Sequence, residues 1–154
     1  SQRYGELPLS SSQKLQECFT RTEWRFVMAY RVSTLKKRNK AAVEALLGER
    51  TVFVLVGGLE ELKELLQFGS HPNICVQLSP SFHQYAKKLY SRCVYEKDAK
   101  ALEEIQEFLR LLCRYRVSPN ASVRNKSMLY NLIAVSRLKL RPQEGLMRML
   151  MRED

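Results

Sequence analysis

The chain has 154 residues, enough for one domain, and its 45% hydrophobic and 27% charged residues are typical of a globular protein. Its apolar runs are far shorter than the ~20 residues that a membrane-spanning helix needs, so a transmembrane protein is not expected. The formal net charge of +10 favours anionic partners, such as acidic protein segments or nucleic acid, but says nothing about the fold.

The amino-terminal residues are polar and lack a signal-peptide pattern, and residues 1–12 are predicted to be a flexible leader before a single domain over residues 13–154. The cysteines are widely separated, with no C-x-x-C pair, and each lies in an apolar stretch: Cys18, Cys75, Cys93 and Cys113. We therefore expect no zinc site and a reducing compartment, the nucleus or the cytoplasm, with the nucleus favoured.

The first half of the domain reads as helix and then strand. A short helix is expected at Gln13–Thr20 and a longer one at Thr22–Leu47, which could break at the basic stretch Lys36–Lys40 and stop at Gly48. The apolar run Thr51–Val56 is too short for a helix and does not alternate, which is typical of a strand buried on both faces of a parallel sheet.

Two strands and the helix between them form a predicted βαβ unit. Gly57–Gly58 turns the chain after the first strand, a helix follows over Leu59–Phe68, and Ile74–Leu78 is the second strand. Two strands alone are marginal. A third strand is therefore expected near Val94 or Arg116–Val117, unless a partner completes the sheet.

The rest of the chain reads as helices. A serine and a proline, Ser79–Pro80–Ser81, mark a helix start. The expected helices are Phe82–Cys93, Ala99–Tyr115 after the capping Asp98, a helix opened by Ser122 or Asn125 and running to about Leu138, and a short Met-rich end, Gln143–Arg152. The predicted fold class is α/β: a small parallel sheet with strands at about 51–56 and 74–78, surrounded by five or more helices.

The predicted strand ends carry little that could perform catalysis. Gly57–Gly58 lacks a phosphate-binding glycine pattern, and Glu60 and Glu61 just after it would repel a phosphate. The chain has only two aspartates, and no nucleophile elbow surrounds Ser79, Ser81 or the nearby His83. We therefore expect no catalytic residue, no cofactor and no metal.

Basic residues concentrate in the last third of the chain. From Arg110 to Arg148 there are nine Lys or Arg and one acid, Glu144. The expected binding residues are Arg110, Arg114, Arg116, Arg124, Lys126, Arg137, Lys139 and Arg141. The first hypothesis is a scaffold or adaptor domain that binds an acidic protein segment or helix. Nucleic-acid binding by the same residues, with tyrosines stacking on bases, is the second, and an enzyme with a degenerate Rossmann-like core is the third.

The order EWRFVMAYRVSTLKKRNKAAVEALL, TVFVLV, NICVQLS and SFHQYAKKLY resembles the C-terminal α/β region of the TASOR subunit of the HUSH silencing complex. The resemblance covers about Glu23–Tyr90 and lies in element order and a few apolar positions. The chain lacks some acids of that region, and its basic helices after Tyr90 do not align. The resemblance implies a nuclear scaffold that contacts chromatin-associated proteins without catalysis.

Overall fold

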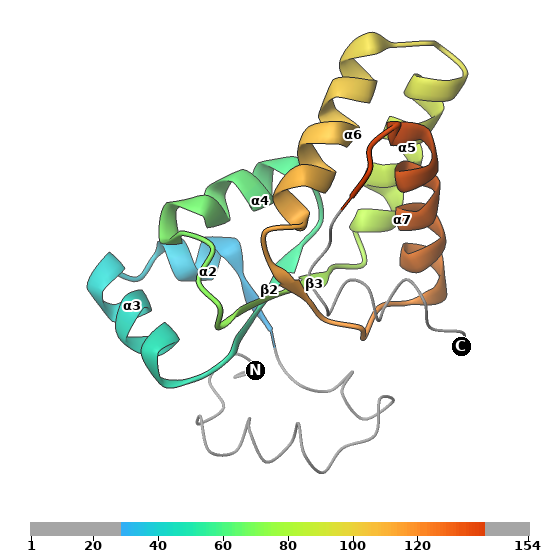
Figure 1. Cartoon of the computed structure of the whole chain (residues 1–154). Coiled ribbons are helices and arrows are strands. Elements are labelled where there is room, and N and C mark those ends of the chain that lie inside the picture. Colours follow the sequence, from blue (N-terminus) through green and yellow to red (C-terminus); the bar gives the residue numbers. More distant parts are fainter. Residues whose placement is uncertain (1–28, 141–154) are drawn as a thin grey trace.

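The computed structural model describes residues 29–140 and has a four-stranded, fully parallel sheet with the strand order β1-β2-β3-β4 (Figure 1). The strands are β1 (Tyr30–Arg31), β2 (Val52–Val56), β3 (Ile74–Leu78) and β4 (Arg116–Val117). The predicted α/β class and the βαβ unit are confirmed, and so is the third strand at Arg116–Val117. Val94, the other place considered for that strand, belongs to a helix.

Six α-helices connect and cover these strands in the described part of the chain. They are α2 (Val32–Lys36), α3 (Lys40–Glu49), α4 (Leu59–Leu65), which continues as the 3-10 turn η3 (Leu66–Phe68), α5 (Phe82–Val94), α6 (Ala99–Leu112) and α7 (Val123–Ser136). The strand order follows the chain order, so right-handed crossovers place the connecting helices on one face of the sheet. Figure 1 shows α4 and α6 on that side of β2 and β3.

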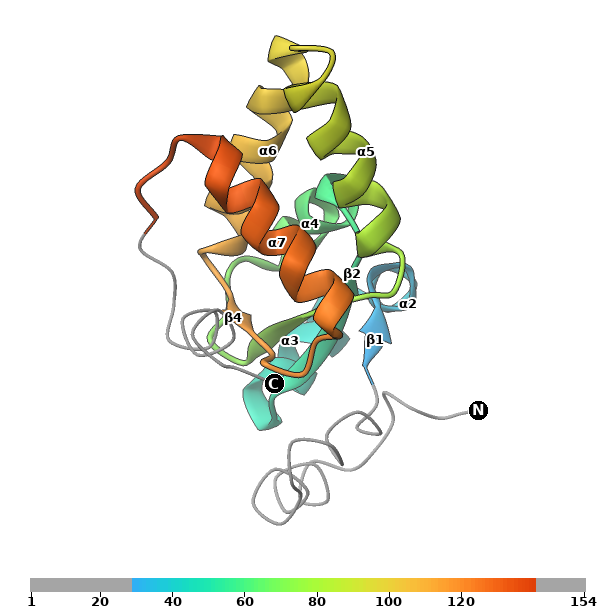
Figure 2. The ribbon, with the colours of Figure 1, turned by 90° about the vertical axis from the view of Figure 1, so that its right-hand side faces the viewer.

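The core lies between this face and the helices. Alternate strand residues enter it, because side chains in a strand point to opposite faces: from β2 these are Val52, Val54 and Val56. The rings of Phe82 and Phe108, from α5 and α6, stack with their centroids 5.6 Å apart, and both side chains are fully buried. Helix α7 packs along α5 and α6 (Figure 2), which completes a helical layer over one face of the sheet.

The helices begin where the sequence supplies caps. The side chain of Asp98 accepts hydrogen bonds from the backbone N–H groups of Lys100 and Ala101 at the start of α6, and Ser122 accepts one from Asn125 at the start of α7. Helix α5 starts differently from the prediction. Its N-cap is Ser81, without a side-chain cap, while the Ser79 and Ser81 hydroxyls bond each other.

The prediction of one helix over Thr22–Leu47 is wrong. Tyr30 and Arg31 pair with β2 as an edge strand, a long-range pairing that helical periodicity cannot reveal. The helical remainder is split at the basic stretch where a break was considered, and Asn39 caps the second piece by accepting from the Ala42 N–H. Gly48 does not stop this helix, which ends at Glu49 as the chain turns into β2.

Several predicted segments lie outside the described residues. These are the leader at residues 1–12, the helix at Gln13–Thr20 and the Met-rich end at Gln143–Arg152. None of the helices between residues 29 and 140 is long and apolar enough to cross a membrane.

Candidate functional site

The carboxyl ends of β2 and β3 lie together at the edge of the sheet where open parallel α/β folds usually bind ligands. The backbone N–H of Gly57 donates to Glu61 Oε1 at 2.6 Å. Glu61 is the third residue of α4, and its carboxylate reaches back across the helix start in the manner of a capping box. A backbone N–H that could hold a phosphate is therefore occupied by a side chain of the protein itself.

The two serines after β3 close the same edge. Ser79 Oγ and Ser81 Oγ are 2.7 Å apart and hydrogen bonded. A Cβ on Gly57 would meet Ser81 Oγ at a distance too short for real atoms and would lie 2.8 Å from Ser79 Oγ. A glycine is thus required at position 57, because a larger side chain would collide with the two serines. The serine hydroxyls already fill the space beside the Gly57 Cα.

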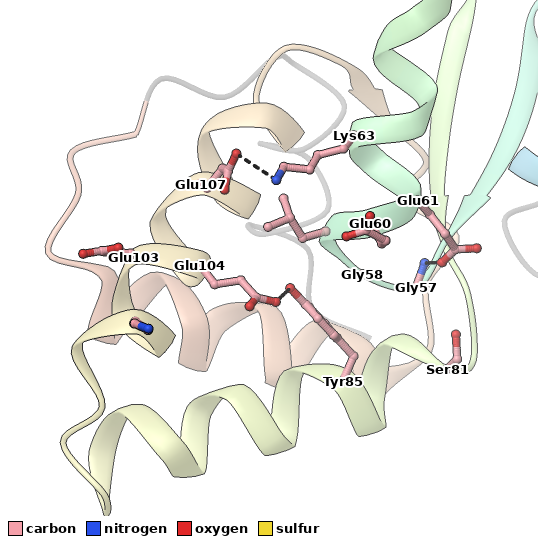
Figure 3. Close-up of a pocket in the computed structure, with 12 residues that line it drawn as sticks. Gly57, Gly58, Glu60, Glu61, Lys63, Ser81, Tyr85, Glu103, Glu104 and Glu107 are labelled. Carbon is pink, nitrogen blue, oxygen red and sulfur yellow. Dashed lines mark hydrogen bonds and ion pairs between the residues drawn. The ribbon is translucent and has the colours of Figure 1, made fainter.

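Beside this edge lies a cleft of about 620 Å³ between α4, α5 and α6 (Figure 3). Its charged lining consists of two lysines and five glutamates: Lys63, Lys100, Glu60, Glu61, Glu103, Glu104 and Glu107. Lys63 lies 3.7 Å from Glu107, in an ion pair that joins α4 to α6. The cleft is acidic, although the sequence as a whole is strongly basic.

A tyrosine and a glutamate join two walls of this acidic cleft. The Tyr85 hydroxyl donates to Glu104 Oε2 at 2.6 Å (Figure 3). Burial, together with this hydrogen bond to a carboxylate, raises the pKa of Tyr85 well above its usual range. The phenol stays protonated at neutral pH, so it acts as a fixed donor between α5 and α6.

The edge does not assemble a recognisable catalytic constellation from the described residues. His83 Nδ1 lies 3.3 Å from an Arg124 guanidinium nitrogen, and no hydrogen bond joins this histidine to Ser79 or Ser81. Desolvation and the nearby charges of Arg124 and Lys87 lower the pKa of His83. Within residues 29–140, no group of three His, Cys, Asp or Glu side chains is placed to hold a metal ion.

The predicted basic residues do not form one continuous face. Lys126 is only 7% exposed, which makes it far less accessible than the other predicted binding residues in the described part of the chain. It shares a helical stripe of α7 with the fully buried Leu129, three residues on, and that stripe faces the domain. Arg116 reaches the Pro72 carbonyl in the loop before β3, whereas Arg124 lies beside His83 on α5. Arg141 lies outside the described residues.

A smaller set of cations is brought together from two segments that are distant in sequence. Gln106 Nε2 donates to the Ser136 carbonyl at 2.9 Å, which ties the middle of α6 to the end of α7. Arg110 follows Gln106 by one helical turn, and Arg137 and Lys139 follow Ser136 directly. We call the exposed cations of these two segments, together with Arg114 just after α6, the C-terminal basic surface: Arg110, Arg114, Arg137 and Lys139.

Sequence reasoning missed two features that join distant segments. Asn125 is buried, and its Nδ2 donates to the Ser79 carbonyl at 2.9 Å, which anchors the start of α7 to the end of β3. The second feature is the acidic cleft. Residues 58–109 are slightly acidic in the sequence, but composition could not show that α4 lies opposite Glu103, Glu104 and Glu107 of α6.

The fold and this edge define a class: an α/β domain with a singly wound parallel sheet, whose carboxyl edge is closed by its own side chains. No protein-family model, curated protein or solved structure matches the chain. The resemblance to the TASOR region therefore stays a prediction from element order.

Proposed function

We propose that this domain is a non-enzymatic protein-interaction module that binds an acidic segment of a partner through the C-terminal basic surface. The Gln106–Ser136 hydrogen bond carries the proposal, because it sets Arg110 beside the residues that follow α7. The ion pairs formed among residues 29–140 leave out Arg110, Arg137 and Lys139, which are exposed. Cations without an internal carboxylate are free to meet an external one.

The backbone at Arg137 adds to this argument. Arg137 ends α7 in the left-handed conformation, with φ of 63°. A non-glycine residue is uncommon there and costs about 1 kcal/mol or more, and glycine is usual at such helix ends. An arginine at a position that favours glycine fits a role for its charge.

The alternative of nucleic-acid binding receives less support from the aromatic residues. Tyr115, which lies between Arg114 and Arg116, is 1% exposed, and its hydroxyl is directed to the Gly69 carbonyl 3.4 Å away. Its ring cannot stack on a base. Tyr130 is exposed on α7, six residues before Ser136. Basic side chains without neighbouring stacking rings favour an acidic protein segment over single-stranded nucleic acid.

A paired affinity experiment tests the proposal. The wild-type domain and the variant Arg114→Glu with Arg137→Glu are used to capture partners from nuclear extract, with and without nuclease. We expect the wild type to retain partners after nuclease treatment. We expect the double variant to lose them by about tenfold or more, because two attractive charges become repulsive.

A matched control separates the surface from the overall charge. Lys87→Glu with Lys88→Glu changes the net charge by the same amount on exposed positions of α5. This control should bind partners as the wild type does. Binding that survives in the Arg114 and Arg137 variant would disprove the basic-surface proposal, and loss of all wild-type partners after nuclease would favour nucleic acid.

A further inference from the structure

A second cleft, of about 490 Å³, lies where β3 ends, between the start of α5 and the start of α7. We call it the α7 cleft, and its polar lining consists of Gln77, His83, Asn120, Ser122, Arg124 and Asn125. Gly57 and Ser81, which close the edge, line only the acidic cleft. The volume of the α7 cleft falls in the range of about 300–1,000 Å³ that small-molecule sites usually have. None of its described lining residues is acidic, so it favours an anionic ligand.

The start of α7 supplies backbone donors to the α7 cleft. Ser122 is the N-cap, and its hydroxyl accepts from the backbone N–H of Asn125. The N–H groups of Val123 and Arg124 come earlier in the first turn, where a helix offers no internal acceptor, and no described side chain caps them. This turn carries no acidic side chain, whereas the first turn of α4 carries two. An anion at the start of α7 would therefore meet two uncapped N–H groups and a favourable helix dipole.

Two side chains add donors beside this helix start. A guanidinium nitrogen of Arg124 lies 3.3 Å from His83 Nδ1. Arginine can only donate, so Nδ1 accepts and the proton of the neutral ring lies on Nε2. Desolvation and the charges of Arg124 and Lys87 lower the pKa of His83, which keeps the ring neutral at neutral pH. The α7 cleft therefore combines a permanent cation with an imidazole N–H.

The wall of the α7 cleft also holds a buried acceptor without a partner. Asn125 is 3% exposed, and its Nδ2 donates to the Ser79 carbonyl at 2.9 Å, which fixes the orientation of the amide. Its Oδ1 has no hydrogen-bond partner among residues 29–140. Such an acceptor is uncommon in folded proteins, because the hydration that it loses on burial is not replaced. A hydroxyl group of a ligand in the cleft would supply the missing donor.

We propose that the α7 cleft binds a small phosphate monoester that also carries a hydroxyl group. The phosphate accepts from the Val123 and Arg124 N–H groups and from the Arg124 guanidinium, and the hydroxyl donates to Asn125 Oδ1. A phosphate presents oxygens in three directions and can meet backbone, guanidinium and imidazole donors at once, whereas the two oxygens of a carboxylate lie in one plane. Arg124 lies outside the C-terminal basic surface, beside His83, so this proposal and the proposed function stand or fall separately.

Titration of the full chain with three probes, followed by backbone amide shifts, tests the proposal. The probes are glycerol phosphate, which has both groups, propyl phosphate, which lacks the hydroxyls, and glycerol, which lacks the phosphate. We expect glycerol phosphate to shift the amides of Val123 and Arg124 and to bind at least about fivefold more tightly than propyl phosphate, because only glycerol phosphate can donate to the Asn125 acceptor. Glycerol should leave these amides unchanged.

Val123→Pro removes one backbone donor without disturbing the helix. Val123 is the first residue of α7 and is exposed, and proline is favoured at this helical position. Ser122 before it has φ of −66° and ψ of 157°, the extended conformation that suits the residue before a proline. We expect Val123→Pro to bind glycerol phosphate at least about fivefold more weakly than Val123→Ala, which keeps the N–H. Thermal melts should show that both variants stay folded.

Arg124→Gln tests the cation of the α7 cleft and should weaken the binding of glycerol phosphate about tenfold. The matched control is Arg110→Gln, which changes the net charge equally on the C-terminal basic surface and should bind the probe as the wild type does. Equal weakening in both variants, equal affinity for glycerol phosphate and propyl phosphate, or shifts that miss Val123 and Arg124 would overturn the proposal. So would tighter binding of a phosphoserine peptide than of glycerol phosphate, because the occupant would then be a protein segment.

Discussion

The carboxyl edge of the sheet and the C-terminal basic surface handle their polar groups in opposite ways. At the edge, Gly57 donates to Glu61, Ser79 bonds Ser81, and Tyr85 donates to Glu104, so the polar groups bind one another. On the basic surface, Arg110 and Arg137 are exposed and take part in no ion pair among residues 29–140.

This contrast indicates which of the two regions is available to bind a partner. Polar groups that hydrogen bond to each other in a half-buried site stabilise the native state. A ligand would have to replace those hydrogen bonds, so its net gain in binding free energy would be small. Exposed cations contribute little to stability and can be redirected to a partner. Changes at the edge should therefore alter folding, and changes on the basic surface should alter binding.

The largest expected effect comes from Gly57→Ala. The added methyl group would force apart the Ser79 and Ser81 hydroxyls, and overpacking of this kind costs about 1–3 kcal/mol of stability. Chemical denaturation measures the loss. The control is Gly48→Ala in α3, where nothing lies within 4 Å of the new Cβ, and which should stabilise by about 0.5–1 kcal/mol. Equal effects at the two glycines would show that the edge is not tightly closed.

Tyr85→Phe removes the hydrogen bond between α5 and α6 and should cost about 1–2 kcal/mol at neutral pH. The pKa of Tyr85 is raised in the folded state, so the protein loses stability as pH rises above about 10, the ordinary tyrosine pKa, where the unfolded chain ionises first. The difference in the free energy of unfolding between the wild type and Tyr85→Phe should narrow above that pH. A constant gap in denaturation curves from pH 7 to 11 would argue against a buried, protonated phenol.

Arg137→Gly tests the role of the C-terminal basic surface in binding. Glycine accepts the left-handed backbone at the end of α7 without strain, so the variant should be about 0.5–1 kcal/mol more stable and bind the acidic partner more weakly. Arg137→Glu keeps the strained backbone and should weaken binding further without the gain in stability. If the Arg137→Gly variant binds the acidic partner as tightly as the wild type does, the charge at this position has no part in recognition.

The smallest effect is expected at Asp98, a half-buried residue that accepts from Arg92 and from the first N–H groups of α6. The hydrogen bond from Arg92 holds the pKa of Asp98 below its usual range. A lowered pKa means that its contribution is present above about pH 4 and is lost as pH falls through the folded-state value. Asp98→Asn should therefore be less stable than wild type at pH 7 and equal to it in acid, as thermal melts at the two pH values would show.

The central strands could be predicted from sequence because their signal is local. Thr51–Val56 and Ile74–Leu78 are short apolar runs between turn residues, and both became parallel strands. The edge strand at Tyr30–Arg31 was missed because two residues carry no periodicity and gain their structure only by pairing with β2. A strand of this length is fixed by tertiary contact, which outweighs the helical pattern around it.

The basic surface was predictable in composition but not in extent. The sequence identified eight cations, but which side of α7 faces the domain depends on packing against α5 and α6, and spacing alone did not show that Lys126 is buried. The Gln106–Ser136 hydrogen bond joins residues 30 positions apart, so no spacing rule could find it. Charge counts therefore located the region, and only the fold selected the residues within it.

Backbone amide shifts during titration of the full chain with a synthetic Glu- and Asp-rich peptide test the central claim most directly. A single-stranded oligonucleotide of equal charge serves as the comparison. We predict that the peptide shifts residues 106–114 and 136–140, that it leaves Gly57, Ser79 and Ser81 unchanged, and that the oligonucleotide binds more weakly. Peptide-induced shifts centred on those three edge residues, with residues 106–114 unaffected, would contradict the account.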